Sequence, residues 1–521
     1  MFQAKELSRQ YILSPKVIPD LPGWTRLDLP NGLYLTAQPD LPVCQARHGS
    51  KSVFLLGYIL KSNEPSWSND DIVQDIVEKI QSPDDAFELT ACCSGRYALI
   101  VHVGDDLIIF HDAGGLRQIF YHIDSDNLCW ISSEPTLIAK HLGLEIDVNI
   151  QKDLNRSELF ALNPDYWFPG RVTLYPSIHR LLPNHYLNIR TQQVIRYWPR
   201  RTIPKIQFVE AVDKLSRILV GLISGASLRS RLALGISCGL DSRVLLAASR
   251  SVASEMQFFT QMTWTMTEDN PEILIPKQLS ERLGFQHKVL ALPNRLPPEF
   301  VSFLMNNLMA AKAFKGVNAY SIAENLLNWG SDTVVVYGNL SEITKRDRFR
   351  YPQVPSWLIS GALLTECVRM TGSTIAFREL SNWLEAVRPL TRLNVNILDL
   401  MHWEQRVGSW AAMTFSIYDV AFETFCPYNC RRYIEYMWGV PFRQRTMPDY
   451  KLHHAIARNL WPETLELPVL TINRETNRLR RWALNALYRT WTYDVIKYLY
   501  LLFYRLPRAH VRKRDRMKEE P

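Results

Sequence analysis

Over most of residues 24–189, hydrophobic and polar positions alternate, or β-branched residues cluster, in short runs separated by polar turns. Gly104-Asp105-Asp106 lies between the apolar runs 97–103 and 107–110, a pattern that predicts a β-hairpin. Only residues 72–80 read clearly as a helix, because their apolar side chains recur at helical spacing with acidic residues between them. This part of the chain is therefore expected to be dominated by β-sheet.

The pattern changes across residues 197–204, where two prolines disfavour a continuous helix or strand ladder. Beyond this linker, apolar runs with helical spacing alternate with short β-rich runs. The helical runs are residues 209–223, 244–249 and 271–283, and the β-rich runs are residues 232–236, 257–263, 288–292 and 333–337. Strands interleaved with helices predict a doubly wound parallel sheet. From residue 394 onward the spacing is mainly helical.

These patterns predict a β-rich unit over residues 1–195 and an α/β unit over residues 205–521. A length of 521 residues exceeds what one hydrophobic core usually organises, and 47% hydrophobic with 21% charged residues is typical of globular proteins. Residues 1–7 lack the pattern of a secretory signal, so we expect a cytoplasmic protein. The eight cysteines form no CxxC pair, which argues against a disulfide scaffold and a zinc cluster.

The net charge of +8 is concentrated near the C-terminus, so the rest of the chain is nearly neutral. Much of the excess lies in Arg505, Arg508, Arg512, Lys513, Arg514, Arg516 and Lys518. No basic stripe with interleaved aromatics crosses the globular part, and we expect no nucleic-acid partner. Charged residues interrupt the aromatic segment 482–506 too often for a membrane span. We expect a C-terminal helix packed on the body; contact of this tail with a membrane surface or a partner protein is the alternative.

Residues 235–243 read Gly-Ile-Ser-Cys-Gly-Leu-Asp-Ser-Arg and join a predicted strand to a predicted helix. Backbone N–H groups at a helix start, next to small residues, form a cradle for phosphate. Ser237 and Ser242 add hydroxyl donors, whereas Asp241 would repel phosphate unless a cation intervenes, which predicts Mg²⁺ at Asp241. The residues expected to bind ATP are Ser237, Cys238, Gly239, Leu240, Asp241, Ser242, Arg243 and Gly338.

This loop resembles the Ser-Gly-Gly-x-Asp-Ser loop of the ATP-pyrophosphatases, with Cys238 at the usual place of the first glycine. The loop has neither the Walker spacing nor the dinucleotide fingerprint. Cysteine is small enough to fit, and a chemical role of its thiol is the alternative reading. A tRNA-modifying pyrophosphatase would match only this loop, and the absence of CxxC pairs weakens that reading.

Further matches resemble the asparagine synthetase superfamily, which includes β-lactam synthetases and lasso-peptide cyclases. Residues 95–99, 111–121, 132–134 and 170–187 are similar to its amidotransferase-type sandwich, and residues 268–270, 283–287, 337–342, 402–410 and 427–432 to its synthetase half. The resemblance implies an Ntn-hydrolase-like β-rich sandwich, followed by an ATP-pyrophosphatase unit of the adenine nucleotide alpha hydrolase-like fold with a helical C-terminal part.

The resemblance assigns roles in the second unit. Glu342 takes the acidic role beside pyrophosphate and Mg²⁺; the alternative is a surface glutamate at a helix start. Arg406 serves the substrate pocket or, alternatively, pairs with Glu404 or Asp419.

Two departures from the family pattern bear on nitrogen transfer. Position 2 is Phe2, where an active class II glutaminase has its nucleophilic cysteine, so glutamine hydrolysis is expected to be absent. The family lysine that follows the terminal helix is also missing from residues 461–474. Arg474 is the candidate substitute as a fixed cation, and Lys451 is the upstream alternative, although its context also suits an exposed lysine.

We therefore expect an ATP-dependent, AMP-forming carboxylate-amine ligase. ATP and Mg²⁺ are the expected cofactors, and Asp241, Glu342, Arg474 and Lys451 the expected catalytic residues. The carboxylate belongs to a small molecule or a peptide, with peptide macrolactam formation and surface-polysaccharide amide formation both open. The amine partner is ammonia or a substrate amine. The alternative is a non-catalytic interaction or scaffold protein. The sequence leaves open whether the chain forms a homodimer.

Overall fold

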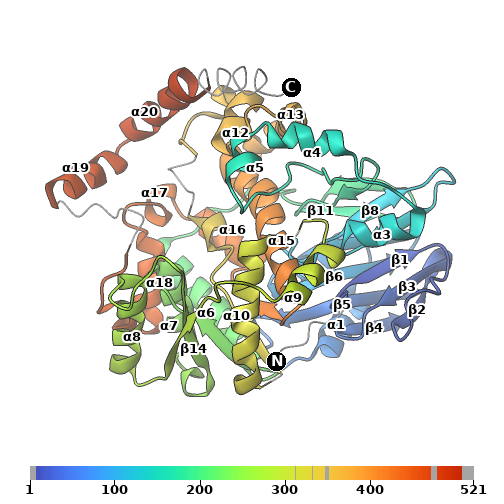
Figure 1. Ribbon diagram of the computed structural model, residues 1–521, viewed down its shortest axis with the longest axis horizontal. Helices are drawn as coiled ribbons and strands as arrows, with labels where there is room; N and C mark the ends of the chain where they lie inside the picture. The colour runs from blue at the N-terminus through green and yellow to red at the C-terminus, as the bar shows by residue number, and fades with distance from the viewer. Residues whose placement is uncertain (1–6, 311, 331, 346–350, 471–477, 507–521) are drawn as a thin grey trace.

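The computed structural model describes residues 7–310, 312–330, 332–345, 351–470 and 478–506 (Figure 1). The protein is mixed α/β: two antiparallel sheets of six strands and one parallel sheet of five strands, with helices around them. Both antiparallel sheets come from residues 11–196 and the parallel sheet from residues 231–425. The sheet types follow the order that the sequence pattern predicts.

The first unit is a sandwich of two antiparallel sheets. One sheet has the order β10-β8-β9-β1-β3-β2, and the other has the order β12-β11-β7-β6-β5-β4. The first consists of β1 (Tyr11–Ser14), β2 (Thr25–Leu29), β3 (Leu33–Ala37), β8 (Phe120–Ile123), β9 (Cys129–Ser132) and β10 (His179–Arg180). The second consists of β4 (Val43–His48), β5 (Lys51–Lys61), β6 (Cys93–Val103), β7 (Asp106–His111), β11 (His185–Asn188) and β12 (Gln193–Arg196).

Strand β6 shows why the apolar runs of this unit are nearly continuous. Ala98 and Ile100 face the other sheet in one core, whereas Leu99 and Val101 belong to a second core that includes the buried side of the first helix. A strand buried on both faces has no need for polar positions. The predicted hairpin is present as β6 and β7, joined at Gly104, whose φ of +58° suits glycine.

Five described α-helices belong to this unit, more than the sequence reading identified; the first three contact its sheets, and the last two pack on each other and against the second unit. They are α1 (Asn69–Lys79), α2 (Pro83–Leu89), α3 (Pro135–Leu142), α4 (Val148–Asn155) and α5 (Glu158–Leu162). Helix α1 is the predicted one, and its Ser68–Asp71 capping box fixes its start. The other four have five to eight residues, too short for a helical period to be recognised, and are marked mainly by their caps.

The second unit is built on a parallel sheet with the order β15-β14-β13-β16-β17. Its strands are β13 (Arg231–Gly235), β14 (Gln257–Met262), β15 (His287–Ala291), β16 (Thr333–Val336) and β17 (Thr424–Phe425). The first four match the predicted strands to within one residue at each end. The order reverses between β13 and β16, the kind of position where ligands bind in open parallel sheets.

Most helices of the chain belong to this second unit. Around the sheet lie α6 (Phe208–Ser227), α7 (Leu240–Ala248), α8 (Pro271–Leu283), α9 (Pro298–Asn307), α10 (Ala313–Trp329) and α11 (Ser341–Thr344). The helical part contains α12 (Gly361–Cys367), α13 (Thr374–Val387), α14 (Ile397–Met401), α15 (Gly408–Asp419), α16 (Arg431–Gly439), α17 (Phe442–Arg445), α18 (Lys451–Leu460), α19 (Arg478–Tyr488) and α20 (Thr492–Tyr500).

A buried charged cluster joins the two units. Arg96 on β6 contacts both carboxylate oxygens of Asp419, at 2.5 and 2.7 Å, and reaches Glu423 at 2.9 Å. Arg117 contacts the same two carboxylates, at 3.0 and 3.2 Å. Burial acts to raise the pKa of Glu423, but Arg96, Arg117 and Arg9 outweigh it and hold that pKa below its usual value. The cluster orients the segment between α15 and β17 against the sandwich.

Candidate functional site

The predicted phosphate loop lies between the carboxyl end of β13 and the start of α7. Helix α7 begins at Leu240, before the predicted helical run 244–249, with Gly239 in an extended conformation as its N-cap. The N–H groups of Leu240, Asp241 and Ser242 form the first turn, which has no acceptors within the helix and carries the positive end of the helix dipole. Strand, loop and helix thus have the arrangement typical of an anion site, and phosphate binding here stays a prediction.

Three amides of the loop already have acceptors within the chain. Ser237 N–H donates to Ser242 Oγ at 3.1 Å, and Gly239 N–H donates to Ser237 Oγ at 3.1 Å. Cys238 N–H donates to a carboxylate oxygen of Glu272, in the first turn of α8, at 3.0 Å. The Glu272 oxygen lies where an anionic ligand oxygen could accept the same hydrogen bond. Phosphate binding at Cys238 would therefore require Glu272 to move.

Asp241 forms an ion pair with a lysine that the sequence reading did not identify. Lys345 Nζ lies 2.6 and 2.5 Å from the two carboxylate oxygens of Asp241, and Ser341 Oγ donates to one of them at 2.6 Å. Burial acts to raise the pKa of Asp241, but the Lys345 ammonium outweighs it and holds that pKa below its usual value. A cation therefore does lie beside Asp241, and it belongs to the chain.

Buried His453 on α18 completes this group. Its Nε2 lies 3.3 Å from Thr344 Oγ1. Burial, with the nearby Lys345 charge, lowers the pKa of His453 to about 3, so the imidazole is neutral at neutral pH. The positive charge that faces Asp241 thus comes from Lys345 rather than from this histidine.

Glu342 follows the turn at Gly338, as the resemblance implies. A Cβ at Gly338 would lie 3.2 Å from the Cβ of Asp241, so this turn passes close to the phosphate loop. Glu342 is half-buried in α11, and burial raises its pKa, with the Asp241 charge adding to the effect. Glu342 thus lies near Asp241 and in the first turn of α11, and its acidic role beside pyrophosphate stays a prediction.

The same residues test the predicted Mg²⁺ site. Mg²⁺ usually takes one or two carboxylates together with phosphate oxygens and water. Here Lys345 contacts both oxygens of Asp241, and burial raises the pKa of Glu342. Among the described residues, no group of three His, Cys, Asp or Glu is placed to hold a metal ion. In this arrangement the residues do not fit Mg²⁺. Magnesium binding stays a prediction, and no step of the reaction is assigned to the ion.

Cys238 is a buried part of the loop. Its thiol donates to the Pro271 carbonyl, and Leu470 N–H donates to the Cys238 carbonyl at 3.1 Å. Burial, with Glu272 nearby, raises the pKa of the thiol to about 12. These contacts favour a packing role over a chemical one.

We expect iodoacetamide to leave Cys238 unmodified in the native protein at neutral pH, because almost no thiolate is present, and to modify it after denaturation. Peptide mass spectrometry measures the modification at each cysteine. Half-buried Cys92 serves as the internal comparison. Faster native alkylation of Cys238 than of Cys92 would contradict the packing role.

Arg406 lies in a second cationic group near Glu342. Its guanidinium lies 4.8 Å from the Trp410 ring centre, and its charge favours the ionised form of Glu342. The two carboxylates offered as alternative partners have other arginine partners, Arg196 for Glu404 and Arg96 with Arg117 for Asp419. A place for Arg406 in a substrate pocket stays a prediction.

Two further lysines join this group from the start of α10. Lys312 and Lys315 contact Asp165 of the first unit at 3.2 and 3.5 Å. Burial lowers the pKa of Lys312 to about 8, although the Asp165 charge acts in the opposite direction. The sequence carried no signal for this pair, because Asp165 comes from another part of the chain.

The two candidates for the family lysine have different outcomes. Lys451 is exposed at the first position of α18, and its charge helps to lower the pKa of Asp449. That placement agrees with the alternative of an ordinary exposed lysine. Arg474 lies outside the described residues, as does Phe2. Among the described residues, Lys345 is a lysine that contacts a predicted site residue, Asp241.

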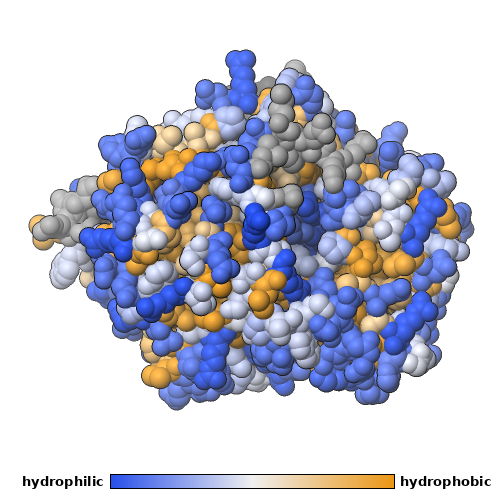
Figure 2. All heavy atoms as spheres, turned by 90° about the horizontal axis from the view of Figure 1, so that it is seen from below, coloured by the Kyte–Doolittle hydropathy of each residue, from blue (hydrophilic) through white to orange (hydrophobic). Residues whose placement is uncertain are grey.

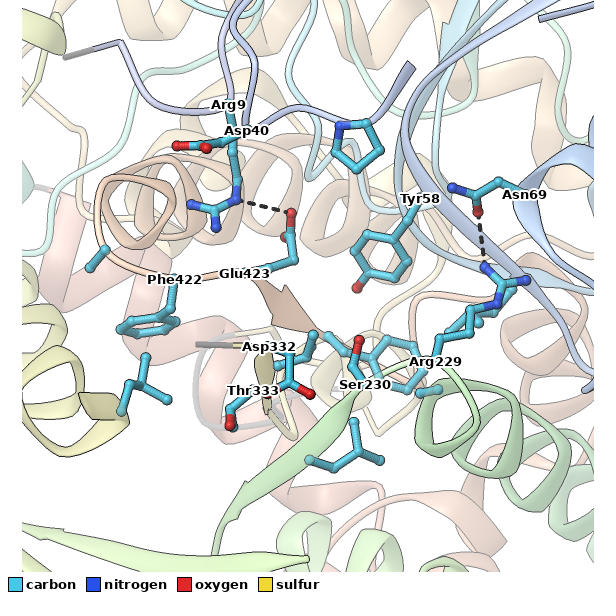
Figure 3. Close-up of a pocket in the computed structure, with 18 of the residues that line it drawn as sticks. Arg9, Asp40, Tyr58, Asn69, Arg229, Ser230, Asp332, Thr333, Phe422 and Glu423 are labelled. Atoms are coloured by element: carbon cyan, nitrogen blue, oxygen red, sulfur yellow. Dashed lines mark hydrogen bonds and ion pairs between the residues drawn. The ribbon is translucent and has the colours of Figure 1, made fainter. Parts of the chain in front are cut away.

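A cavity of about 640 Å³ lies elsewhere (Figure 3). Leu232 and Thr333, at the amino ends of β13 and β16, line it, together with Tyr58 of the sandwich. Figure 3 shows Arg9 paired with Glu423 across one side of it. All strands of a parallel sheet run in one direction. This cavity, at the amino ends of the strands, therefore lies at the opposite end of the sheet from the phosphate loop, which follows a carboxyl end. Its lining includes none of the predicted site residues that the structure describes.

No family model matches the chain, and no curated protein matches it. Solved structures match at low similarity. A glutamine-dependent NAD+ synthetase from Acinetobacter baumannii in complex with ADP is 15% identical over 33% of this chain and 32% of its own length, with a TM-score of 0.20. This chain thus covers about a third of that protein.

Two other solved structures match over more of the chain. The U34-tRNA thiolase NcsA from Methanococcus maripaludis is 13% identical over 60% of this chain and 80% of its own, with a TM-score of 0.22. The glutamine PRPP amidotransferase from B. subtilis complexed with ADP and GMP is 11% identical over 64% and 75%, also at 0.22. Similarity this low carries neither a shared fold nor a shared function to this chain.

Proposed function

We propose that this protein is an ATP-dependent, AMP-forming ligase that joins a substrate carboxylate to an amine or ammonia. The observation that carries the proposal is the start of α7, where the first-turn amides and the Lys345 ammonium lie within one loop region. Together with the resemblance to the asparagine synthetase superfamily, it favours binding of the triphosphate at the carboxyl ends of β13 and β16.

The proposed chemistry has two steps. A carboxylate oxygen attacks the α-phosphorus of ATP, the bond to the bridging oxygen breaks, and pyrophosphate leaves with its electron pair. The amine nitrogen then attacks the acyl carbon and loses a proton, and AMP leaves. The loop amides and Lys345 stabilise the charge that builds up on the phosphate oxygens, which is the largest contribution expected from a preorganised site.

The positive charges near Glu342 support a binding site for the substrate carboxylate. Arg406 and Lys312 are close enough to influence each other's charge, and Arg406 also lies near Glu342. A carboxylate held by Arg406 would lie on the same side of the sheet as the phosphate loop. Lys312, with its pKa near 8, suits acceptance of the proton that the amine loses.

Glutamine is not the nitrogen source under this proposal. A glutaminase of this kind needs a reactive thiolate, and burial raises the pKa of seven of the eight cysteines: Cys44, Cys93, Cys129, Cys238, Cys367, Cys426 and Cys430. The sandwich then acts as a degenerate amidotransferase-like unit that supports the second unit through the Arg96 cluster.

Pyrophosphate exchange into ATP with a panel of carboxylates tests the proposal. We expect exchange with at least one carboxylate, and product formation when ammonium or an amine is added. Glutamine alone is expected to give no product. Glutamine-driven turnover without ammonium would overturn the choice of nitrogen source.

A non-catalytic role is the second candidate. It is favoured by the three loop amides whose acceptors lie within the chain. Calorimetry separates the two candidates, because ATP binding without exchange for any carboxylate of the panel would support the non-catalytic role.

A further inference from the structure

The segment formed by α20 and the turn after it has an outer face that is almost wholly apolar. Its exposed residues recur three and four positions apart, on one side of the helix. They are Trp491, Thr492, Val495, Ile496, Leu499, Tyr500, Phe503 and Tyr504. Phe503 is 75% exposed and Trp491 is 68% exposed. Large apolar side chains gathered on a surface in this way mark an interaction site.

The inner face of the same segment packs on the body through Leu501 and through buried charged contacts. Asp494 is buried and accepts a hydrogen bond from Gln353 N–H at 2.8 Å. Arg505 contacts Glu158 at 2.9 Å and Glu366 at 2.7 Å. Turning the helix to bury its apolar face would break these contacts and leave charged groups without partners. The polar contacts therefore hold the apolar face outward.

Helix α19 extends this surface. Figure 1 shows α19 and α20 in red along one margin of the molecule, with α19 projecting beyond the other helices. Leu479 and Trp482, one turn apart, are 79% and 71% exposed. On the face of the molecule in Figure 2, by contrast, hydrophobic patches are broken up by hydrophilic residues. Two consecutive helices thus expose aromatic and aliphatic side chains.

The charge of the chain is concentrated in the same region. Residues 478–521 contain twelve Lys and Arg but only four Asp and Glu. Their excess equals the net charge of +8, so residues 1–477 are neutral. The apolar face is therefore part of, or continuous with, the only strongly basic part of the sequence.

We propose that α19 and α20 rest on an anionic lipid bilayer, with their aromatic and aliphatic face in the headgroup region. Trp, Tyr and Phe prefer that region, and basic residues add attraction to anionic lipid. No described helix is both long and apolar enough to cross a membrane, so the helices lie on the surface. The positive charge of residues 478–521 favours a bilayer over a protein partner, because binding to an apolar protein groove does not require so large an excess of basic residues.

Co-sedimentation of the full chain with vesicles tests this proposal. We expect binding to phosphatidylcholine vesicles that contain phosphatidylserine, weak binding to pure phosphatidylcholine, and release by added salt. Trp491→Ser combined with Phe503→Ser is expected to weaken binding by at least about tenfold, because two exposed aromatic anchors are lost. Trp264→Ser is the matched control, since Trp264 is 52% exposed in the loop before α8, and it should bind like the wild type.

Three outcomes would overturn the proposal: no binding to the anionic vesicles, equal binding by the Trp491→Ser/Phe503→Ser variant, or equal binding to neutral vesicles. A dimer in sedimentation velocity that the double variant converts to monomer, without vesicle binding, would replace the bilayer by a second copy of the chain. Thermal unfolding of each variant checks its folding. The result is independent of the ligase proposal, because exchange activity is measured without lipid.

Discussion

Asp241→Asn is expected to lower carboxylate-dependent exchange of pyrophosphate into ATP by about 10²–10³-fold, the usual effect of removing one preorganised electrostatic group from an active site. The substitution keeps the shape of the side chain but removes the charge that holds Lys345 at 2.5 Å. Without that partner the ammonium loses its fixed position beside the loop. Exchange at the wild-type rate would remove the central claim of the ligase proposal.

Two further variants serve as the control for this experiment and as a test of how Asp241 acts. Asp105→Asn changes an exposed carboxylate in the hairpin turn and should leave exchange unchanged. Lys345→Gln removes the other half of the ion pair. If Asp241 acts by positioning Lys345, the two single variants and the double variant should lose similar activity, because residues that act as a unit are not additive. Additive losses would show that Asp241 has a separate role.

Four of the five strands of the parallel sheet could be predicted because their signal is local, whereas the two-residue β17 fell in a region predicted to be mainly helical. Residues 333–337 form a β-branched run beside helical runs, and burial on both faces of the sheet requires such a run. The loop after β13 could be predicted equally well, because its strand, its small residues and its helix are consecutive in the sequence. Helices such as α5, five residues long, escaped prediction because their stability comes from caps and tertiary contacts rather than from a recognisable period.

The parts of the site that pair distant residues could not be predicted. Lys345 follows Asp241 by 104 positions, and Lys312 follows Asp165 by 147. A lysine in sequence has no mark that separates a site residue from an exposed one, so Lys451 was as good a candidate as Lys345. The C-terminal segment packs on the body as expected, through residues such as Tyr488 and Leu501, but the sequence did not show that a second apolar face would stay exposed.

Asp419→Asn is expected to lower the free energy of unfolding by about 3–5 kcal/mol, the usual cost of breaking one partner out of a buried charge cluster. Asp419 accepts contacts from Arg96 and Arg117, whose side chains are buried. Asparagine would leave two buried guanidinium groups with Glu423 as their remaining carboxylate in this cluster. Urea denaturation measures the change. Asp213→Asn, which breaks an exposed pair with Arg217, should shift stability by no more than about 0.5 kcal/mol.

Glu423→Gln tests the same cluster through pH. The pKa of Glu423 is held below its usual value in the folded protein, so its contribution to stability is fully present above the unfolded value of about 4.3. That contribution is lost as the pH falls through the lower folded value. The stability difference between wild type and Glu423→Gln should therefore be full at neutral pH and shrink in acid. A difference that stays constant down to low pH would mean that packing, and not the charge on Glu423, stabilises the joint between the two units.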